Sequence, residues 1–266
     1  MTQSTRRRHH ELTDIFADAR PVIPFITAGY PTKRVFQDTI RAAVDAGAGA
    51  VEIGMPFSDP LADGPAIQLS SQVALEHGID LPEVLKLTED LRRHIDVPLI
   101  LMGYLNPLMQ MGFERFARRA VDAGVSGTII PDCPVGEAKE WRAVSRDHGL
   151  ANIFLIAPTT TDERIAVIDR ASTAFSYCVS VAGVTGARGD VAASTRKFLQ
   201  RVAAIAKKPY VVGFGISAPR HIKELKHLAH GFVVGSALVR ILRDEPAKMA
   251  PLEAHRFIRS LVRAAK

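Results

Sequence analysis

Residues 51–65, which read VEIGMPFSDPLADGP, join a short apolar segment to a loop that is rich in proline and glycine. Glu52 lies in the middle of the apolar segment, a predicted strand, and Asp59 and Asp63 follow in the loop. An ionised carboxylate in an apolar strand costs several kcal/mol unless it is paired or takes up a proton. A position with so high a cost indicates a chemical role.

Short apolar runs similar to this one recur along the whole chain. Eight can be distinguished, at residues 22–27, 50–54, 98–103, 127–131, 152–157, 174–180, 210–215 and 231–235. Their length and their content of Val, Ile and Phe predict buried strands. Segments with helical apolar spacing lie between them, such as the stripe of Phe36, Ile40 and Ala43.

The alternation of strands and helices predicts a parallel sheet. Eight such units in 266 residues favour a closed (β/α)8 TIM barrel, which typically takes about 250 residues, over an open sheet. No linker divides the chain, so we expect a single domain over residues 1–266. Extra helices are expected near residues 9–19, before the first strand, and near residues 67–76, after the second. A last helix over residues 253–265 closes the ring.

Strand alternation predicts the direction of the Glu52 side chain. If Val51 and Ile53 face the outer helices, then Ala50, Glu52 and Gly54 face the interior of the barrel. Glu52 also lies near the C-terminal end of its strand, which is the end that carries the active site in barrels of this type. The carboxylate is therefore expected to point into an active-site cavity.

The three carboxylates allow more than one interpretation. Glu52 is interpreted as a general acid or base with a pKa raised by burial; the alternative is a structural carboxylate that caps a loop or pairs with an arginine. Taken singly, Asp59 before Pro60 and Asp63 before Gly64 are typical turn residues. Three acids could hold a divalent metal, but no histidine accompanies them and their spacing matches no metal motif. We therefore expect no metal.

Three glycine-containing turns follow the last three predicted strands. They are GVTGA at residues 183–187, GFGIS at residues 213–217, and the pair Gly235 and Ser236. Backbone N–H groups at such turns, with a helix N-terminus behind them, form anion sites, and phosphate binding after strands seven and eight recurs in this barrel. The alternative is that the glycines only permit tight turns. A phosphate-bearing small molecule is the favoured ligand.

Composition excludes several other classes of protein. The formal charge of +6 comes from scattered basic residues, apart from a run at residues 6–8 that is interpreted as a solvated arm, so no nucleic-acid partner is expected. Cys133 and Cys178 lie in apolar segments without close spacing, which indicates reduced buried thiols. No run predicts a membrane span or a signal-peptide core, so a cytoplasmic location is expected.

Beyond these inferences, the chain resembles the tryptophan synthase alpha chain family over nearly its whole length. The segment VEIGMPFSDPLADGP carries the most specific part of the resemblance. The other matching segments are IPFITAGYP at residues 23–31, PDCPVGE at 131–137, GVTG at 183–186, GFGIS at 213–217 and VGSA at 234–237.

The resemblance implies a carbon–carbon lyase that cleaves indole-3-glycerol phosphate to indole and glyceraldehyde 3-phosphate in L-tryptophan biosynthesis. It assigns acid/base catalysis to Glu52, contact with the indole N–H to Asp63, and a place at the site to Tyr177. The apolar indole slot would be lined by Phe25, Leu101, Ile129 and Phe214. The phosphate would be held by Gly186, Gly215, Gly235 and Ser236, and Thr185 would be a further substrate-binding residue.

The resemblance also implies a partner. Family members work with a beta chain that uses pyridoxal phosphate and receives the indole, in an α2β2 heterotetramer, whereas the alpha chain carries no cofactor. Pro56, Asp59 and Pro60 match the segment that faces this partner, and residues 183–190 match a mobile lid. Some relatives have Arg and Ser or Thr at the positions of Val181 and Ala182, so lid hydrogen bonding and coupling to the partner are expected to differ here.

Two alternatives share these motifs. One is a stand-alone indole-3-glycerol-phosphate lyase without a beta chain, which only an assay with and without that partner distinguishes. The other is a non-catalytic subunit that binds phosphate ligands and regulates a partner, although the presence of both Glu52 and Asp63 argues against it. A phosphosugar isomerase on the same fold is less favoured, because barrel architecture alone says little about the reaction.

Overall fold

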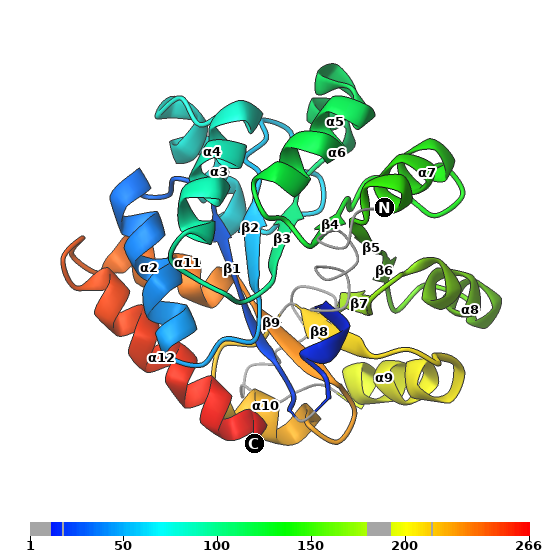
Figure 1. Ribbon diagram of the computed structural model, residues 1–266. Coiled ribbons are helices and arrows are strands. Elements are labelled where there is room, and N and C mark those ends of the chain that lie inside the picture. The colour runs from blue at the N-terminus through cyan, green and yellow to red at the C-terminus, as the bar shows by residue number, and fades with distance from the viewer. Residues whose placement is uncertain (1–11, 18, 180–192, 214) are drawn as a thin grey trace.

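The computed structural model describes residues 12–17, 19–179, 193–213 and 215–266. In this part of the chain, parallel strands form a ring with helices outside it (Figure 1). The strands are β1 (Val22–Thr27), β2 (Val51–Gly54), β3 (Leu99–Met102), β4 (Gly127–Ile129), β5 (Ala151–Ile153), β6 (Leu155–Ile156), β7 (Ser176–Val179), β8 (Tyr210–Gly213) and β9 (Gly231–Val234).

The ring closes through one continuous segment, residues 151–156. The strand order is β5-β4-β3-β2-β1-β9-β8-β7-β6, and β5 pairs with β4 whereas β6 pairs with β7. Only Phe154 separates these two short strands, and its carbonyl accepts a hydrogen bond of 3.0 Å from the backbone N–H of Tyr177. The nine strands are therefore the eight predicted ones, with the fifth interrupted, and the predicted (β/α)8 TIM barrel is confirmed.

Helices follow the strands along the chain and cover the outside of the ring (Figure 1). They are α2 (Lys33–Asp45), α3 (Pro65–Glu76), α4 (Leu81–Arg92), α5 (Leu105–Met111), α6 (Phe113–Asp122), α7 (Lys139–His148), α8 (Asp162–Ala171), α9 (Ala193–Ile205), α10 (Pro219–Leu225), α11 (Ser236–Asp244) and α12 (Ala250–Ala265). Several begin at a capping side chain. Thr32, for example, accepts a hydrogen bond from the backbone N–H of Val35.

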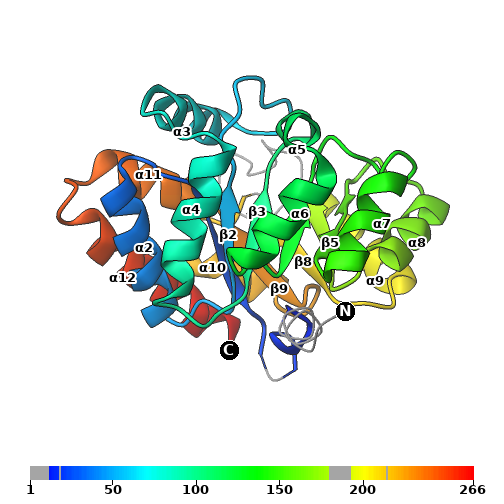
Figure 2. The same cartoon turned by 45° about the horizontal axis from the view of Figure 1, so that its top comes forward.

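Two of the three extra elements expected from the sequence are fully described. The helix after the second strand is α3, and the closing helix is α12. The expected first helix is described only in part, with residues 12–14 in a helical turn. Figure 2 shows this turn at one end of the barrel and α3 and α5 at the opposite end.

Apolar side chains form two layers, as strand alternation predicts. Ala50 belongs to the cluster inside the ring, whereas Val51 and Ile53 belong to the cluster between the strands and the helices. At the N-terminal end of the strands, the fully buried Leu12 joins the interior cluster. This packing fills that end of the barrel.

The first and last strands are neighbours, because β1 pairs with β9. This pairing supports a single domain, which stays a prediction.

Cys133 and Cys178 are free and buried, as expected. None of the described helices combines the length and the apolar character that crossing a bilayer requires.

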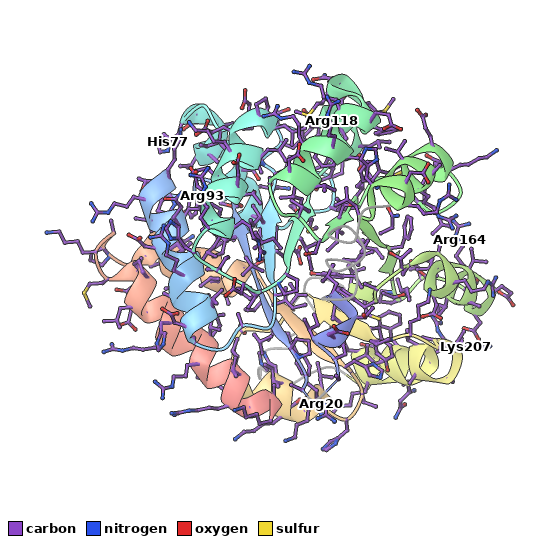
Figure 3. All side chains as sticks on the ribbon, viewed as in Figure 1. Arg20, His77, Arg93, Arg118, Arg164 and Lys207 are labelled. Carbon is purple, nitrogen blue, oxygen red and sulfur yellow. The ribbon has the colours of Figure 1, made fainter. Side chains whose placement is uncertain are left out.

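Basic side chains are spread over the surface of the described part of the chain. Figure 3 labels six of them at widely separated places, in agreement with the scattered basic residues of the sequence: Arg20, His77, Arg93, Arg118, Arg164 and Lys207.

Candidate active site

A cavity of about 600 Å³ lies at the C-terminal ends of the strands. Its wall includes Phe25 of β1, Glu52 of β2 and Tyr177 of β7, together with residues of the loops that follow β2, β8 and β9. Several predicted site residues thus meet in one place. The predicted residues that line the cavity are Phe25, Glu52, Asp63, Tyr177, Gly215, Gly235 and Ser236.

Glu52 points into the barrel because of its register in the sheet. Its Cα is aligned with that of Phe25 on β1 and that of Ile100 on β3, and both of these neighbours have side chains in the interior cluster. The residue is only 1% exposed, and neither carboxylate oxygen has a hydrogen-bond partner among the described residues. No arginine satisfies it there, which disfavours the structural alternative.

Burial raises the pKa of Glu52 to about 8, and the nearby charge of Asp63 adds to the shift. At neutral pH the carboxyl group is therefore mostly protonated. A neutral acid at the wall of a cavity can donate a proton to a bound molecule and take one back, which is the behaviour of a general acid/base.

Asp63 lies in the loop after β2, and a tyrosine that the sequence analysis did not single out holds it in place. The Tyr104 hydroxyl donates a hydrogen bond of 3.1 Å to Oδ2 of Asp63 and accepts one of 2.9 Å from the backbone N–H of Ala62. Burial raises the pKa of Asp63 to about 6, and the bond from Tyr104 opposes that rise. Asp63 is therefore mostly ionised at neutral pH while Glu52 is mostly protonated.

Tyr104 also connects Asp63 to the segment that was predicted to face a partner. Its ring stacks on Phe57, with centroids 5.2 Å apart and ring planes inclined by 27°. Tyr104 comes two residues after β3 ends at Met102. A polar side chain just beyond the C-terminal end of a barrel strand is the sequence signal that could have identified it.

Tyr177 lies beside Glu52 and is 4% exposed. Burial, with added effects from the charges of Glu52 and Asp63, raises the pKa of its phenol far above the usual value, so the hydroxyl keeps its proton. A Cβ atom on Gly213 of β8 would overlap the ring and hydroxyl of Tyr177. Glycine at position 213 therefore makes the space that this side chain occupies.

Phe25 forms an apolar wall between two other glycines. A Cβ atom would lie 2.5 Å from Cζ of Phe25 if placed on Gly54, and 3.2 Å from its Cδ1 if placed on Gly235. The ring therefore packs directly on two stretches of backbone, one of which belongs to the predicted phosphate turn. This close approach agrees with the prediction that Phe25 lines the slot for an aromatic ligand.

One predicted lining residue was wrong. Leu101 is aligned with Ile53 on the neighbouring strand, and both side chains face the helices rather than the interior. The next residue, Met102, points inward and lines the cavity. Ile129 is aligned with Met102 and belongs to the interior cluster, but it is not among the residues that line the cavity.

Other predicted residues lie outside the described part of the chain. These are Phe214, Thr185 and Gly186, together with Val181, Ala182 and the proposed lid at residues 183–190.

Another part of the cavity wall, where α11 begins, has the features of an anion site. Gly235 immediately precedes α11, which begins at Ser236, so the free N–H groups of the first helical turn lie at the cavity wall. Gly215, with φ of 82°, takes the left-handed conformation that favours glycine and lines the same wall. Arg240 and Arg243 line the cavity from α11 as well. The cavity is therefore acidic on one side and basic on another.

The predicted partner segment lies outside this cavity. Asp59 is exposed and accepts a 2.5 Å hydrogen bond from the Ser58 hydroxyl. Pro60 is partly exposed, whereas Pro56 is buried and lines a separate groove of about 570 Å³ beside α4 and α5.

Among the described residues, no cluster of His, Cys, Asp or Glu side chains could hold a metal ion.

Comparison with known proteins identifies the family. The family model described as tryptophan synthase alpha chain matches residues 16–262, which include all of the strands. The chain belongs to the tryptophan synthase alpha chain family.

Individual tryptophan synthase alpha chains support this assignment. The one from Roseiflexus sp. (strain RS-1) is 44% identical over 241 residues, covering 90% of this chain and 92% of the relative. The crystal structure of tryptophan synthase subunit alpha from Legionella pneumophila str. Paris matches with a TM-score of 0.88 and 35% identity over 98% of both chains.

A solved tryptophan synthase complex also contains a chain of this shape. The structure described as the tryptophan synthase α2β2 complex from Pyrococcus furiosus matches with a TM-score of 0.87 and 40% identity, over 91% of this chain and 98% of that one. The fold of this chain is thus shared with a chain of a tryptophan synthase α2β2 complex.

Proposed function

We propose that this chain cleaves indole-3-glycerol phosphate to indole and glyceraldehyde 3-phosphate, as a carbon–carbon lyase of L-tryptophan biosynthesis. One observation carries the proposal. Two carboxyl groups of the family's most specific motif, Glu52 and Asp63, face one cavity, and burial raises the pKa of Glu52 above that of Asp63. This retro-aldol reaction requires a proton donor and a separate negative charge.

The first step of the proposed reaction protonates the substrate. The neutral Glu52 carboxyl donates its proton to C3 of the indole ring, and the ring becomes a cationic indolenine. The ionised Asp63 carboxylate accepts a hydrogen bond from the indole N–H and stabilises the positive charge that grows on the ring. This interaction is stronger in the transition state than in the neutral substrate, as catalysis requires.

The second step breaks the carbon–carbon bond. The Glu52 carboxylate, now without its proton, removes the proton from the side-chain hydroxyl next to the breaking bond. The oxygen forms the aldehyde carbonyl of glyceraldehyde 3-phosphate, and the electron pair of the broken bond returns to the ring and neutralises it. Glu52 ends the cycle protonated, so protons and electrons balance.

The remaining wall residues position the substrate. The indole ring is proposed to lie against Phe25 and Met102, with Tyr177 beside the reacting carbons. The phosphate is proposed to bind at Gly215, Gly235 and Ser236, where backbone N–H groups and one hydroxyl can donate hydrogen bonds. The substrate would then span the cavity from its acidic side to its basic side.

A beta chain is the proposed partner, in an α2β2 assembly with pyridoxal phosphate in the beta chain and no cofactor in this one. The assembly of the similar Pyrococcus furiosus protein supports this partner. Asp59 and Pro60 are proposed to contact it, together with the nearby Leu61, whose apolar side chain is 92% exposed. The cytoplasm stays the expected location.

Indole production from indole-3-glycerol phosphate tests the proposal. The purified chain should form indole, and an added beta chain should accelerate this reaction. Fast turnover that a beta chain does not change would favour the stand-alone lyase. No indole with or without a beta chain, while phosphate ligands still bind, would favour the regulatory subunit.

A further inference from the structure

Two arginines of α11 line the cavity, and they differ in their partners among the described residues. Arg243 donates to the Asp244 carboxylate through two nitrogens, at 2.7 Å from Nε and 3.2 Å from one Nη. Arg240 also lines the cavity, but among the described residues its guanidinium makes no hydrogen bond or ion pair. Its charge helps to lower the pKa of Asp244, whose oxygens bond to Arg243.

The position of Arg240 on α11 directs it toward the proposed phosphate site. Arg240 is four residues after Ser236, so the two lie on the same face of the helix, one turn apart. Long helical side chains extend back toward the N-terminus of their helix. The Arg240 side chain is exposed and therefore free to reach the first turn of α11, where Gly235 and Ser236 line the cavity.

The charge of a phosphate monoester calls for a group of this kind. At neutral pH the ester carries nearly two negative charges, whereas a helix N-terminus supplies the equivalent of about half a positive charge. An arginine adds a full charge and two parallel N–H donors that match the phosphate oxygens. The free N–H groups of α11 and the Arg240 guanidinium would bind different oxygens of one phosphate.

We propose that Arg240 is a specificity-determining residue that binds the phosphate of the substrate and selects phosphorylated over unphosphorylated indole compounds. The inference rests on the proposed function for the identity of the substrate and adds a side-chain cation to its phosphate site. The phosphate takes no part in the bond changes, and Arg240 would contact only the phosphate. Its contribution should therefore be the same in the ground state and the transition state, which changes KM rather than kcat.

Binding of glycerol 3-phosphate, measured by calorimetry, tests the role of Arg240 without turnover. Arg240→Gln should weaken this binding roughly tenfold, as expected when a charged hydrogen bond is lost. Arg240→Lys, which keeps the charge but not the paired donors, should recover part of the affinity. Arg259→Gln is the matched control, because Arg259 is exposed on α12, does not line the cavity and carries the same charge.

Kinetics with indole-3-glycerol phosphate give the second readout. Arg240→Gln should raise KM by a similar factor and leave kcat within about twofold. Affinities for glycerol 3-phosphate that agree between Arg240→Gln and wild type, or that fall equally in Arg259→Gln, would overturn the proposal. Failure of the wild-type chain to bind glycerol 3-phosphate would also overturn the proposal. Because calorimetry needs no cleavage, failure of the lyase function would leave this test decisive.

Discussion

The Tyr104 hydroxyl donates a hydrogen bond of 3.1 Å to the Asp63 carboxylate across 41 residues of sequence. Through this bond the loop after β3 fixes the position of a charged group in the loop after β2. The same tyrosine stacks on Phe57, so it lies between the cavity and the segment proposed to face the beta chain. Tyr104 is therefore a positioning residue that acts through Asp63.

Replacing Tyr104 by phenylalanine should change the pH dependence of the reaction. Without the donated bond the pKa of Asp63 should rise above its value of about 6, because burial is no longer opposed. The acidic limb of the profile of kcat/KM against pH should move to higher pH, with an activity loss of several-fold at pH 7. Phe57→Leu, which removes the ring contact but keeps the bond, is the control. Coincident acidic limbs for Tyr104→Phe and wild type would contradict this role.

Asp63→Asn should abolish nearly all indole formation. The amide keeps the size of the side chain but cannot supply the negative charge that stabilises the indolenine, so kcat should fall by about 10² or more. Asp96→Asn, the same change at an exposed position outside the cavity, is the matched control. Indole release at the wild-type rate by Asp63→Asn, measured in a single turnover, would disprove the assignment to the indole N–H.

The raised pKa of Glu52 should appear in the stability of the protein. The carboxyl titrates near 4.5 when unfolded and near 8 when folded, so the folded state binds more protons between these values. The stabilisation that this group contributes is fully present below its pKa in the unfolded state. It is lost as the pH rises through its pKa in the folded state. Between pH 6.5 and 8.5, above the pKa of Asp63, the free energy of unfolding should fall in wild type.

Glu52→Gln removes the titrating group and should remove this decline. Urea denaturation of both proteins at several pH values measures the effect, and the stability difference should grow in favour of the variant as pH rises. Parallel curves for the two proteins across this pH range would show that Glu52 does not take up a proton on folding.

The packing of Tyr177 on Gly213 predicts a coupled pair of substitutions. Gly213→Ala should destabilise the protein by about 1–3 kcal/mol, a typical cost of overpacking, because its Cβ overlaps the tyrosine ring. In a Tyr177→Ala background the same change should cost much less, since the ring is gone. The free energies of unfolding of the two single variants and the double variant measure this coupling. Additive effects would contradict the close packing of the two residues.

The sequence predicted the barrel because its apolar runs are short and regularly interrupted, and it predicted the direction of Glu52 because strand side chains alternate. The same alternation, applied to β3, would have placed Leu101 on the outside, where it lies beside Ile53. That assignment came from the resemblance and not from the register. The interruption of the fifth strand at Phe154 depends on pairing with two different neighbours, which no local pattern records.

The position of Tyr104 just beyond a predicted strand marks it as a candidate in the sequence, but for a similar reason its partners could not be predicted. Its contacts with Ala62 and Asp63 join loops that are distant in the chain, and only the closed ring brings them together. Arg240 is also only partly recognisable from the sequence. Its four-residue spacing from Ser236 is visible in the sequence, but the cavity that both line is not.

Single-turnover release of indole by Glu52→Gln, measured beside a thermal melt, tests the central claim most directly. The amide has the shape of the protonated carboxyl but has no acidic proton to give to the indole ring, so the variant should fold and release almost no indole. A rate above about a tenth of the wild-type value corresponds to an increase in the activation barrier of less than ~1.4 kcal/mol. Such a rate in a folded Glu52→Gln variant would contradict acid/base catalysis by Glu52.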